Sequence, residues 1–158
     1  EFGNDQVVME RFNMTELITG VANSTKILRE QKNIRLELEN PEEAWVWGDE
    51  FKVEEVITNY MRNAINHADG EKVIRVFYTC SENKLRVSLF NTGQPIPEED
   101  LDKIWVKFYK VDKARTREYG GSGIGLSIVK AIMDSLHQQC GVINHEDGVE
   151  FWMELSTK

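Results

Sequence analysis

A glycine-rich run that leads directly into a helical pattern limits the folds open to this chain. Apolar residues recur at helical spacing after it, and the run reads Gly120, Gly121, Ser122, Gly123, Ile124, Gly125, Leu126, Ser127. Glycines let the backbone approach an anion closely, and the unpaired amides of a helix N-terminus favour phosphate. No Gly-Lys-Ser/Thr follows, and no early parallel crossover unit contains the run, so a P-loop and a dinucleotide fold are disfavoured. A tight loop or close helix packing is the alternative.

Helical and strand-like patterns alternate along the rest of the chain. Helices are expected over 15–31, 49–68 and 122–136, with a short one inside 98–110. Strands are expected over 33–39, 73–79, 84–90, 140–145 and 149–155. Thr15 and Asp49 are the expected helix caps, and 111–121 is an expected mobile loop. This mixed order predicts an α+β fold, a two-layer α/β sandwich with helices on one face of a mainly antiparallel sheet.

The acidic balance narrows the choice of partners. The formal net charge is −8, which argues against a general binder of nucleic acid or membrane surfaces. Cys80 and Cys140 lack metal-ligand spacing and are expected to be reduced, partly buried thiols in a cytoplasmic protein, with a disulfide as the alternative. No apolar run approaches the roughly 20 residues of a membrane helix. Residues 1–10 are interpreted as a linker or expression remnant, and 11–158 as one domain.

Two asparagines stand one helical turn apart in the expected helix over 49–68. Asn59 and Asn63 share one face beside an apolar stripe. Two carboxamide oxygens so placed can accept a water and a magnesium ion, which prefers hard oxygen ligands shared with phosphates. A solvated polar edge is the alternative interpretation.

A third polar signal follows an apolar strand. The stretch Asn91, Thr92, Gly93, Gln94, Pro95, Ile96 can present an acceptor to an adenine amino group, while the glycine leaves room for the ring. An ordinary turn would have the same composition.

Together these segments resemble the catalytic ATP-binding domain of bacterial sensor histidine kinases. In this comparison 49–68 is the N box, 91–96 the first glycine box, 104–112 the F box and 121–125 the second glycine box. The resemblance runs from about Arg11 to the C-terminal strands. It implies the left-handed Bergerat ATP-binding fold, shared with DNA gyrase B, MutL and the large heat-shock chaperones.

The resemblance also implies roles for individual residues and the cofactors ATP and Mg²⁺. Asn63 would be the magnesium ligand, Asn59 would position water or magnesium, and Lys110 would reach the terminal phosphates, which makes these three the catalytic set. The ATP lid would be 111–120, with Lys113, Arg115 and Arg117 offsetting phosphate charge. The implied cofactor-binding set is Asn59, Asn63, Asn66, His67, Asn91, Gly93, Ile96, Tyr109, Lys110, Gly121, Ser122, Gly123, Ile124, Gly125 and Leu126.

The chain departs from the family pattern at several positions. Asn91 stands where the family usually has Asp, and a neutral amide is a weaker acceptor than a carboxylate. Asn66 stands where a lysine is common, and Trp105 where a phenylalanine is usual. The stretch Gly148, Val149, Glu150, Phe151 replaces a common glycine-threonine turn.

An acceptor histidine is the feature that the sequence lacks. His67, His137 and His145 do not have the helical, acid-flanked setting of a phosphoacceptor. The resemblance therefore implies transfer to a histidine on a separate dimerisation domain, then to a response regulator, with no nucleic acid involved. The piece is expected to be monomeric, cytoplasmic and part of a membrane-anchored parent. It should bind nucleotide without phosphorylating itself.

Three other functions are weighed at this point, one of them a serine kinase for anti-sigma partners, a branch that generally lacks the F box. A gyrase-like or chaperone-like ATPase switch typically carries a glutamate base where Asn59 stands. A nucleotide-sensing or degenerate domain would hold ATP without transferring it, which Asn66 and Asn91 keep possible.

Overall fold

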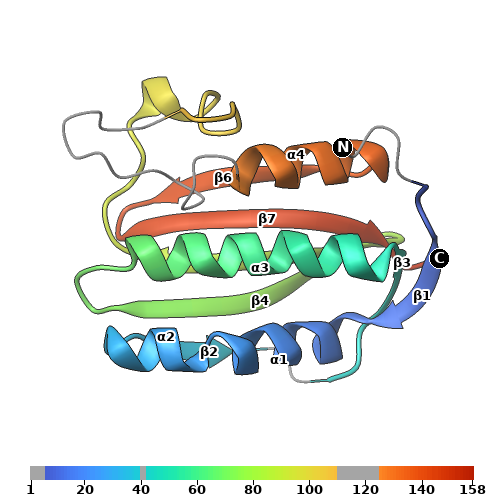
Figure 1. The fold of residues 1–158 in the computed structure, drawn as a ribbon, viewed down its shortest axis with the longest axis horizontal. Helices are drawn as coiled ribbons and strands as arrows, with labels where there is room; N and C mark the ends of the chain where they lie inside the picture. The colour runs from blue at the N-terminus through green and yellow to red at the C-terminus, as the bar shows by residue number, and fades with distance from the viewer. Residues whose placement is uncertain (1–5, 40–41, 110–124) are drawn as a thin grey trace.

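The protein forms two layers, a sheet and a row of helices on one of its faces (Figure 1). The structure is a computed structural model that describes residues 6–39, 42–109 and 125–158. Its helices are α1 Met14–Ser24, α2 Lys26–Gln31, α3 Glu50–His67 and α4 Gly125–Ser135, with the short 3₁₀ helix η2 Glu98–Asp100. The predicted α+β sandwich is confirmed.

The described strands make one mixed, mainly antiparallel sheet. They are β1 Glu10–Asn13, β2 Arg35–Leu38, β3 Trp45–Gly48, β4 Val73–Ser81, β5 Lys84–Thr92, β6 Cys140–His145 and β7 Gly148–Ser156. Their order is β1-β3-β7-β5-β4-β2, and β6 also pairs with β7. Among the described pairs only β2 and β4 run parallel.

The core lies between the sheet and α3. The apolar stripe of α3 is buried, and alternate residues of β5 and β7, including Val87, Leu89, Phe151 and Met153, are buried with it. Asp49 caps α3 as predicted, because its side chain accepts a hydrogen bond from the Lys52 amide at 3.3 Å. This helix therefore enters the site with a fixed start and a fixed buried face.

The expected first helix is two helices, and its cap prediction is wrong. Asn13 is the N-cap, and its Oδ1 accepts from the Thr15 amide at 3.1 Å. The helix is interrupted at Thr25, whose hydroxyl donates to the Val21 carbonyl at 2.8 Å. Arg29 then donates to the Ala22 carbonyl at 2.9 Å, so a guanidinium satisfies the C-terminal end of α1.

Several other expectations need correction. The short strands β1 and β3 are not predicted, because neither ERFN nor WVWG alternates apolar and polar residues as the equally short β2 does. The predicted helix inside 98–110 is one 3₁₀ turn at Glu98–Asp100 followed by turns. Both cysteines are free as expected, yet Cys80 is exposed at the hairpin end of β4, whereas Cys140 is half-buried. None of the described helices has the length and hydropathy needed to cross a bilayer.

Candidate functional site

The predicted motifs converge at one end of the molecule. The C-terminal end of α3, the end of β5 and the segment with η2 lie together there (Figure 1). The Asp69 amide, just beyond α3, donates to the Thr92 carbonyl at the end of β5 at 2.9 Å. This bond joins the N box to the first glycine box, which are separate in the sequence.

The polar row of α3 is set by the helix register. Asn63 is fully buried, at 0% exposure, within a helix that packs on α4. Asn59 is half-buried, and its Nδ2 donates to the Glu55 carbonyl one turn earlier at 2.8 Å. That contact uses the amide nitrogen, so the Asn59 oxygen is the atom left to accept or coordinate. Asn66 and His67, both half-buried, complete the row at the end of the helix.

Asn91 is oriented by its own neighbour. It is 2% exposed, and its Nδ2 donates to the Thr92 carbonyl at 3.0 Å. A carbonyl only accepts, so the nitrogen must face it and the carboxamide oxygen points the other way. Within the described residues no hydrogen bond reaches that oxygen. The neutral amide thus offers a fixed acceptor, the group that an amino-bearing base requires.

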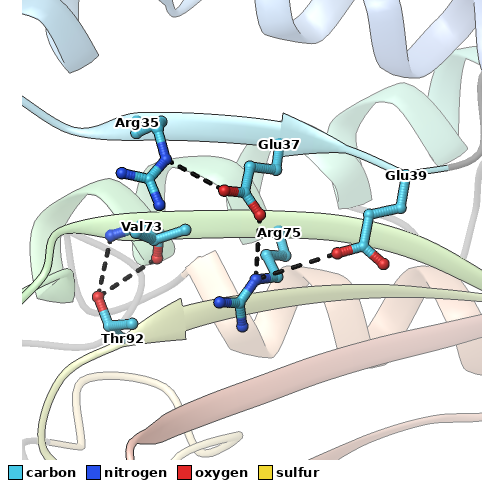
Figure 2. Close-up of polar contacts among 6 residues, drawn as sticks. All are labelled: Arg35, Glu37, Glu39, Val73, Arg75 and Thr92. Carbon is cyan, nitrogen blue, oxygen red and sulfur yellow. Dashed lines mark hydrogen bonds and ion pairs between the residues drawn. The ribbon is translucent and has the colours of Figure 1, made fainter.

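Thr92 fixes the strand end that carries Asn91. Its Oγ1 accepts from the Val73 amide at 2.9 Å, which ties the end of β5 to the start of β4 (Figure 2). Its carbonyl accepts from both Asn91 and Asp69. The side chain and the main chain of one residue therefore hold three segments together.

Gly93 allows a close backbone approach between α3 and the end of β5. Its φ is +149°, and a Cβ placed on it would lie 2.7 Å from the His67 carbonyl oxygen. Its amide donates to the Asp147 carbonyl at 3.0 Å. A side chain at this position would push α3 away from the β5 end.

Ile96 is a core residue held by a contact that sequence reasoning missed. The side chain is buried, and the Asn144 carboxamide binds both of its main-chain groups. The Ile96 amide donates to Asn144 Oδ1 at 3.0 Å, and Asn144 Nδ2 donates to the Ile96 carbonyl at 2.7 Å. Nothing in the local pattern around Asn144 marks it as a partner of a segment almost 50 residues away.

The F-box aromatics occupy two different environments. Trp105 packs edge-on against Phe151 with ring centroids 5.9 Å apart. The Tyr109 hydroxyl donates to the buried Asp100 carboxylate, a second contact that the sequence did not suggest. That bond raises the pKa of Tyr109 above its ordinary value. Phe108 between them is exposed with a φ of +66°.

The second glycine box is described only where α4 begins. Gly125 and Leu126 are buried in the first turn of that helix. The other predicted site residues of this region and the predicted lid 111–120 lie outside the described residues: Lys110, Gly121, Ser122, Gly123 and Ile124.

The donor chemistry fits a magnesium ion that arrives with its nucleotide. The described residues hold no group of three or more His, Cys, Asp or Glu side chains able to bind a metal. Asn59 and Asn63 offer amide oxygens, and Mg²⁺ keeps several waters and shares substrate phosphates when protein ligands are few. A site with one or two amide oxygens suits that mode of binding.

Comparison with known proteins gives one consistent result. The family model for "Histidine kinase-, DNA gyrase B-, and HSP90-like ATPase" matches residues 48–158. Sensor protein VanSB of Enterococcus faecalis is 32% identical over 128 residues, 81% of this chain and 29% of VanSB. Sensor histidine kinase CusS of Escherichia coli O157:H7 is 29% identical over 154 residues, 96% of this chain and 32% of CusS. This chain thus spans less than a third of the length of these two relatives.

Solved structures agree on the fold. The catalytic domain of histidine kinase ThkA superimposes with a TM-score of 0.80 at 32% identity, over 95% of this chain and 96% of that domain. The mycobacterial sensor histidine kinase MprB shows the same fold with a TM-score of 0.79 at 20% identity. This chain belongs to the histidine kinase-, DNA gyrase B- and HSP90-like ATPase family, as a catalytic domain of the sensor histidine kinase type.

Proposed function

We propose that this domain binds MgATP between α3 and the start of α4 and donates the γ-phosphoryl group to a histidine on a separate dimerisation domain. The observation that carries this proposal is the convergence of α3, with the buried Asn63, on the acceptor Asn91 and the close approach at Gly93. The family membership supports an ATP ligand. An amide acceptor and a metal-binding amide are the two contacts that the ends of an adenine nucleotide need.

The chain's own residues would position the reaction rather than take part in it covalently. When bound, magnesium would neutralise phosphate charge and polarise the transferred group. Asn63 would hold the ion, and Asn59 would orient its water through the oxygen left by the Glu55 contact. Lys110 is proposed to reach the terminal phosphates, and Tyr109, held by Asp100, to pack near the nucleotide.

The partners follow from the same proposal. ThkA has been solved in complex with the response regulator protein TrrA, in a structure 28% identical to this chain with a TM-score of 0.78. We propose that the parent of this domain likewise passes its phosphoryl group to a response regulator. We propose in addition that the domain by itself is monomeric and that its parent is membrane-anchored with this part in the cytoplasm.

Calorimetric titration with a non-hydrolysable ATP analogue tests the site. We expect magnesium-dependent binding that weakens by about 100-fold in Asn63→Ala, the loss of about 2.7 kcal/mol of binding free energy. Asn23→Ala, an exposed asparagine on α1, is the matched control and should bind as the unchanged protein does. No binding by the intact domain would end the enzyme proposal for this chain.

Phosphoryl transfer needs a separate assay. Radiolabelled ATP with an added histidine-containing dimerisation domain should label that domain and leave this one unlabelled. Binding without transfer to any such domain would favour the nucleotide-sensing alternative.

A further inference from the structure

The end of β6 and the turn that follows it hold the first glycine box at Gly93 and at Ile96. At Gly93, the amide donates to the Asp147 carbonyl at 3.0 Å. At Ile96, both main-chain groups bind the Asn144 carboxamide, at 3.0 and 2.7 Å. Only Gln94 and Pro95 lie between these anchors. The box is thus attached to a hairpin that none of the recognised motifs includes.

Asn144 replaces a strand neighbour that the loop does not have. Beyond the end of β5 at Thr92 the ladder stops, although Ile96 is still buried in the core. A buried amide and carbonyl without partners would each cost free energy. The Asn144 side chain presents one acceptor and one donor side by side, as a peptide group of an adjacent strand would.

The position of Asn144 in its own strand shows that packing alone does not explain it. In β6 the side chains of Val142 and Asn144 fall on the same face, because residues two apart in a strand share a face. Asn144 pairs with the buried Val149, and Val142 with the buried Phe151. An apolar residue would continue this face, so the amide is there for the contact with Ile96.

The hairpin also fixes the residue that carries the acceptor. A Cβ placed on Gly148 would lie 2.1 Å from the Asn91 carbonyl oxygen, so the two backbones are in direct contact. Contacts with the stretch from Asn144 to Gly148 therefore fix the positions of Asn91, Gly93 and Ile96. A displacement of this stretch would move the segment from Gly93 to Ile96 relative to the Asn91 acceptor.

We propose that Asn144 is a positioning residue for base recognition, which sets how strictly the site selects a 6-aminopurine through Asn91. This inference rests on the proposed MgATP function. With the box in place, the amino group of adenine meets the fixed carboxamide oxygen. A 6-oxopurine would place its carbonyl oxygen against that acceptor and be rejected.

Binding of ATP and of inosine triphosphate, which differ at purine position 6, tests the proposal. The intact domain should prefer ATP by at least about tenfold, because the oxo compound loses a hydrogen bond and faces an acceptor. Asn144→Ala should lower ATP affinity by about tenfold and reduce the preference to about twofold or less. The control Glu146→Gln, an exposed change in the same turn, should keep both values.

A second variant keeps the test independent of folding. Asn144→Asp retains the acceptor for the Ile96 amide, but when ionised it sets a carboxylate against the Ile96 carbonyl. The half-buried position and the Ile96 carbonyl oxygen both disfavour the ionised carboxylate. Lowering the pH from 7.5 to 5 should therefore partly restore the ATP preference of this variant, because a protonated carboxyl can again donate, while the intact domain measured alongside stays constant.

The outcomes separate the proposed function from the inference that rests on it. Absence of ATP binding by the intact domain would defeat the proposed function itself. ATP binding without preference over inosine triphosphate would overturn the inference. So would Asn144 variants that lower the melting temperature yet keep the full ATP preference, since that would be a structural role alone.

Discussion

Two polar regions on the same sheet are built on opposite principles. At the end of β5, Asn91 and Thr92 are neutral, buried and bonded to named main-chain groups (Figure 2 shows Thr92 on Val73). Across the β2–β4 edge in the same figure, Arg75 lies 3.1 Å from Glu37 and 4.0 Å from Glu39, all partly exposed to solvent. The charged edge has the ion pairs, but the neutral hydrogen bonds at the end of β5 are the contacts that fix the positions of the chain segments.

The difference follows from burial. Exposed ion pairs gain little because water and salt screen the charges and both long side chains must be ordered. A buried neutral group that loses its partner costs the full desolvation penalty, so its position is closely specified. The site end is therefore expected to respond to small changes of shape, and the edge to pH and salt.

The largest effect is expected from Gly93→Ala. The positive φ and the 2.7 Å approach to the His67 carbonyl both oppose a Cβ, so we expect a loss of about 3 kcal/mol in unfolding free energy and no nucleotide binding. Denaturant unfolding and calorimetry measure the two effects. Gly70→Ala is the matched control, since its φ is +66° but nothing lies within 4 Å of the added Cβ.

The control separates strain from contact. Gly70→Ala should cost only about 1 kcal/mol and retain binding. Equal losses at the two glycines would show that backbone strain, rather than the contact between α3 and β5, makes Gly93 necessary.

An intermediate effect is expected from Ser88→Ala. Ser88 is fully buried, and its hydroxyl donates to Glu150 Oε2 at 2.7 Å. Glu150, itself 7% exposed, would keep only its 2.8 Å contact with His145 Nε2 among the described groups. We expect a loss of about 1–2 kcal/mol in unfolding free energy, measured by denaturant titration.

Ser156→Ala tests whether burial is the cause. Ser156 also uses its hydroxyl in a hydrogen bond, to the Lys158 carbonyl at 2.8 Å, but that bond is exposed. Losing this hydrogen bond should change the free energy of unfolding by less than about 0.5 kcal/mol. A comparable loss at both serines would contradict the burial argument.

The smallest effect is expected at the charged edge. Arg35 and Arg75 hydrogen-bond the Glu37 carboxylate and lower its pKa below the ordinary value of 4.5. A lowered folded-state pKa gives a contribution that is present above about pH 4.5 and is lost as the pH falls through the folded value. Glu37→Gln should therefore leave MgATP affinity unchanged and lower the melting temperature slightly at pH 7, and this difference should disappear once the pH has fallen below the folded-state pKa of Glu37.

Salt provides the opposing check on this edge. High salt should remove the difference in melting temperature between the intact domain and Glu37→Gln, because salt screens exposed ion pairs. A difference that persists in 1 M salt would mean that Glu37 contributes through packing instead.

The sequence predicted the long, regular elements better than the short ones. The α3 stripe, its Asp49 cap and the strands β4, β5, β6 and β7 are predicted from the sequence and are present. Their periodicity extends over nine or more residues in α3, β4, β5 and β7, which makes it detectable. The strands β1 and β3 lack the alternation of apolar and polar residues that marks the equally short β2, so only their pairing with each other reveals them.

The sequence also predicted one part of the candidate site and left another part open. Asn59, Asn63 and Asn91 were identified from spacing and from the family resemblance, and the structure brings their elements to one end of the molecule. The sequence left open which way the Asn91 amide points, and the Thr92 carbonyl decides it.

By itself the sequence determined the long helical and extended segments, the apolar stripe of α3 that faces the core, and the order of four motifs. These properties depend on neighbours within a turn or two of the same chain. Only the tertiary structure decided that Arg29 binds a carbonyl at the C-terminal end of α1, that Asp100 accepts from Tyr109, and that Asn144 binds the first glycine box at Ile96. Such contacts satisfy single buried donors and acceptors across the fold, and no local periodicity encodes which distant group will complete them.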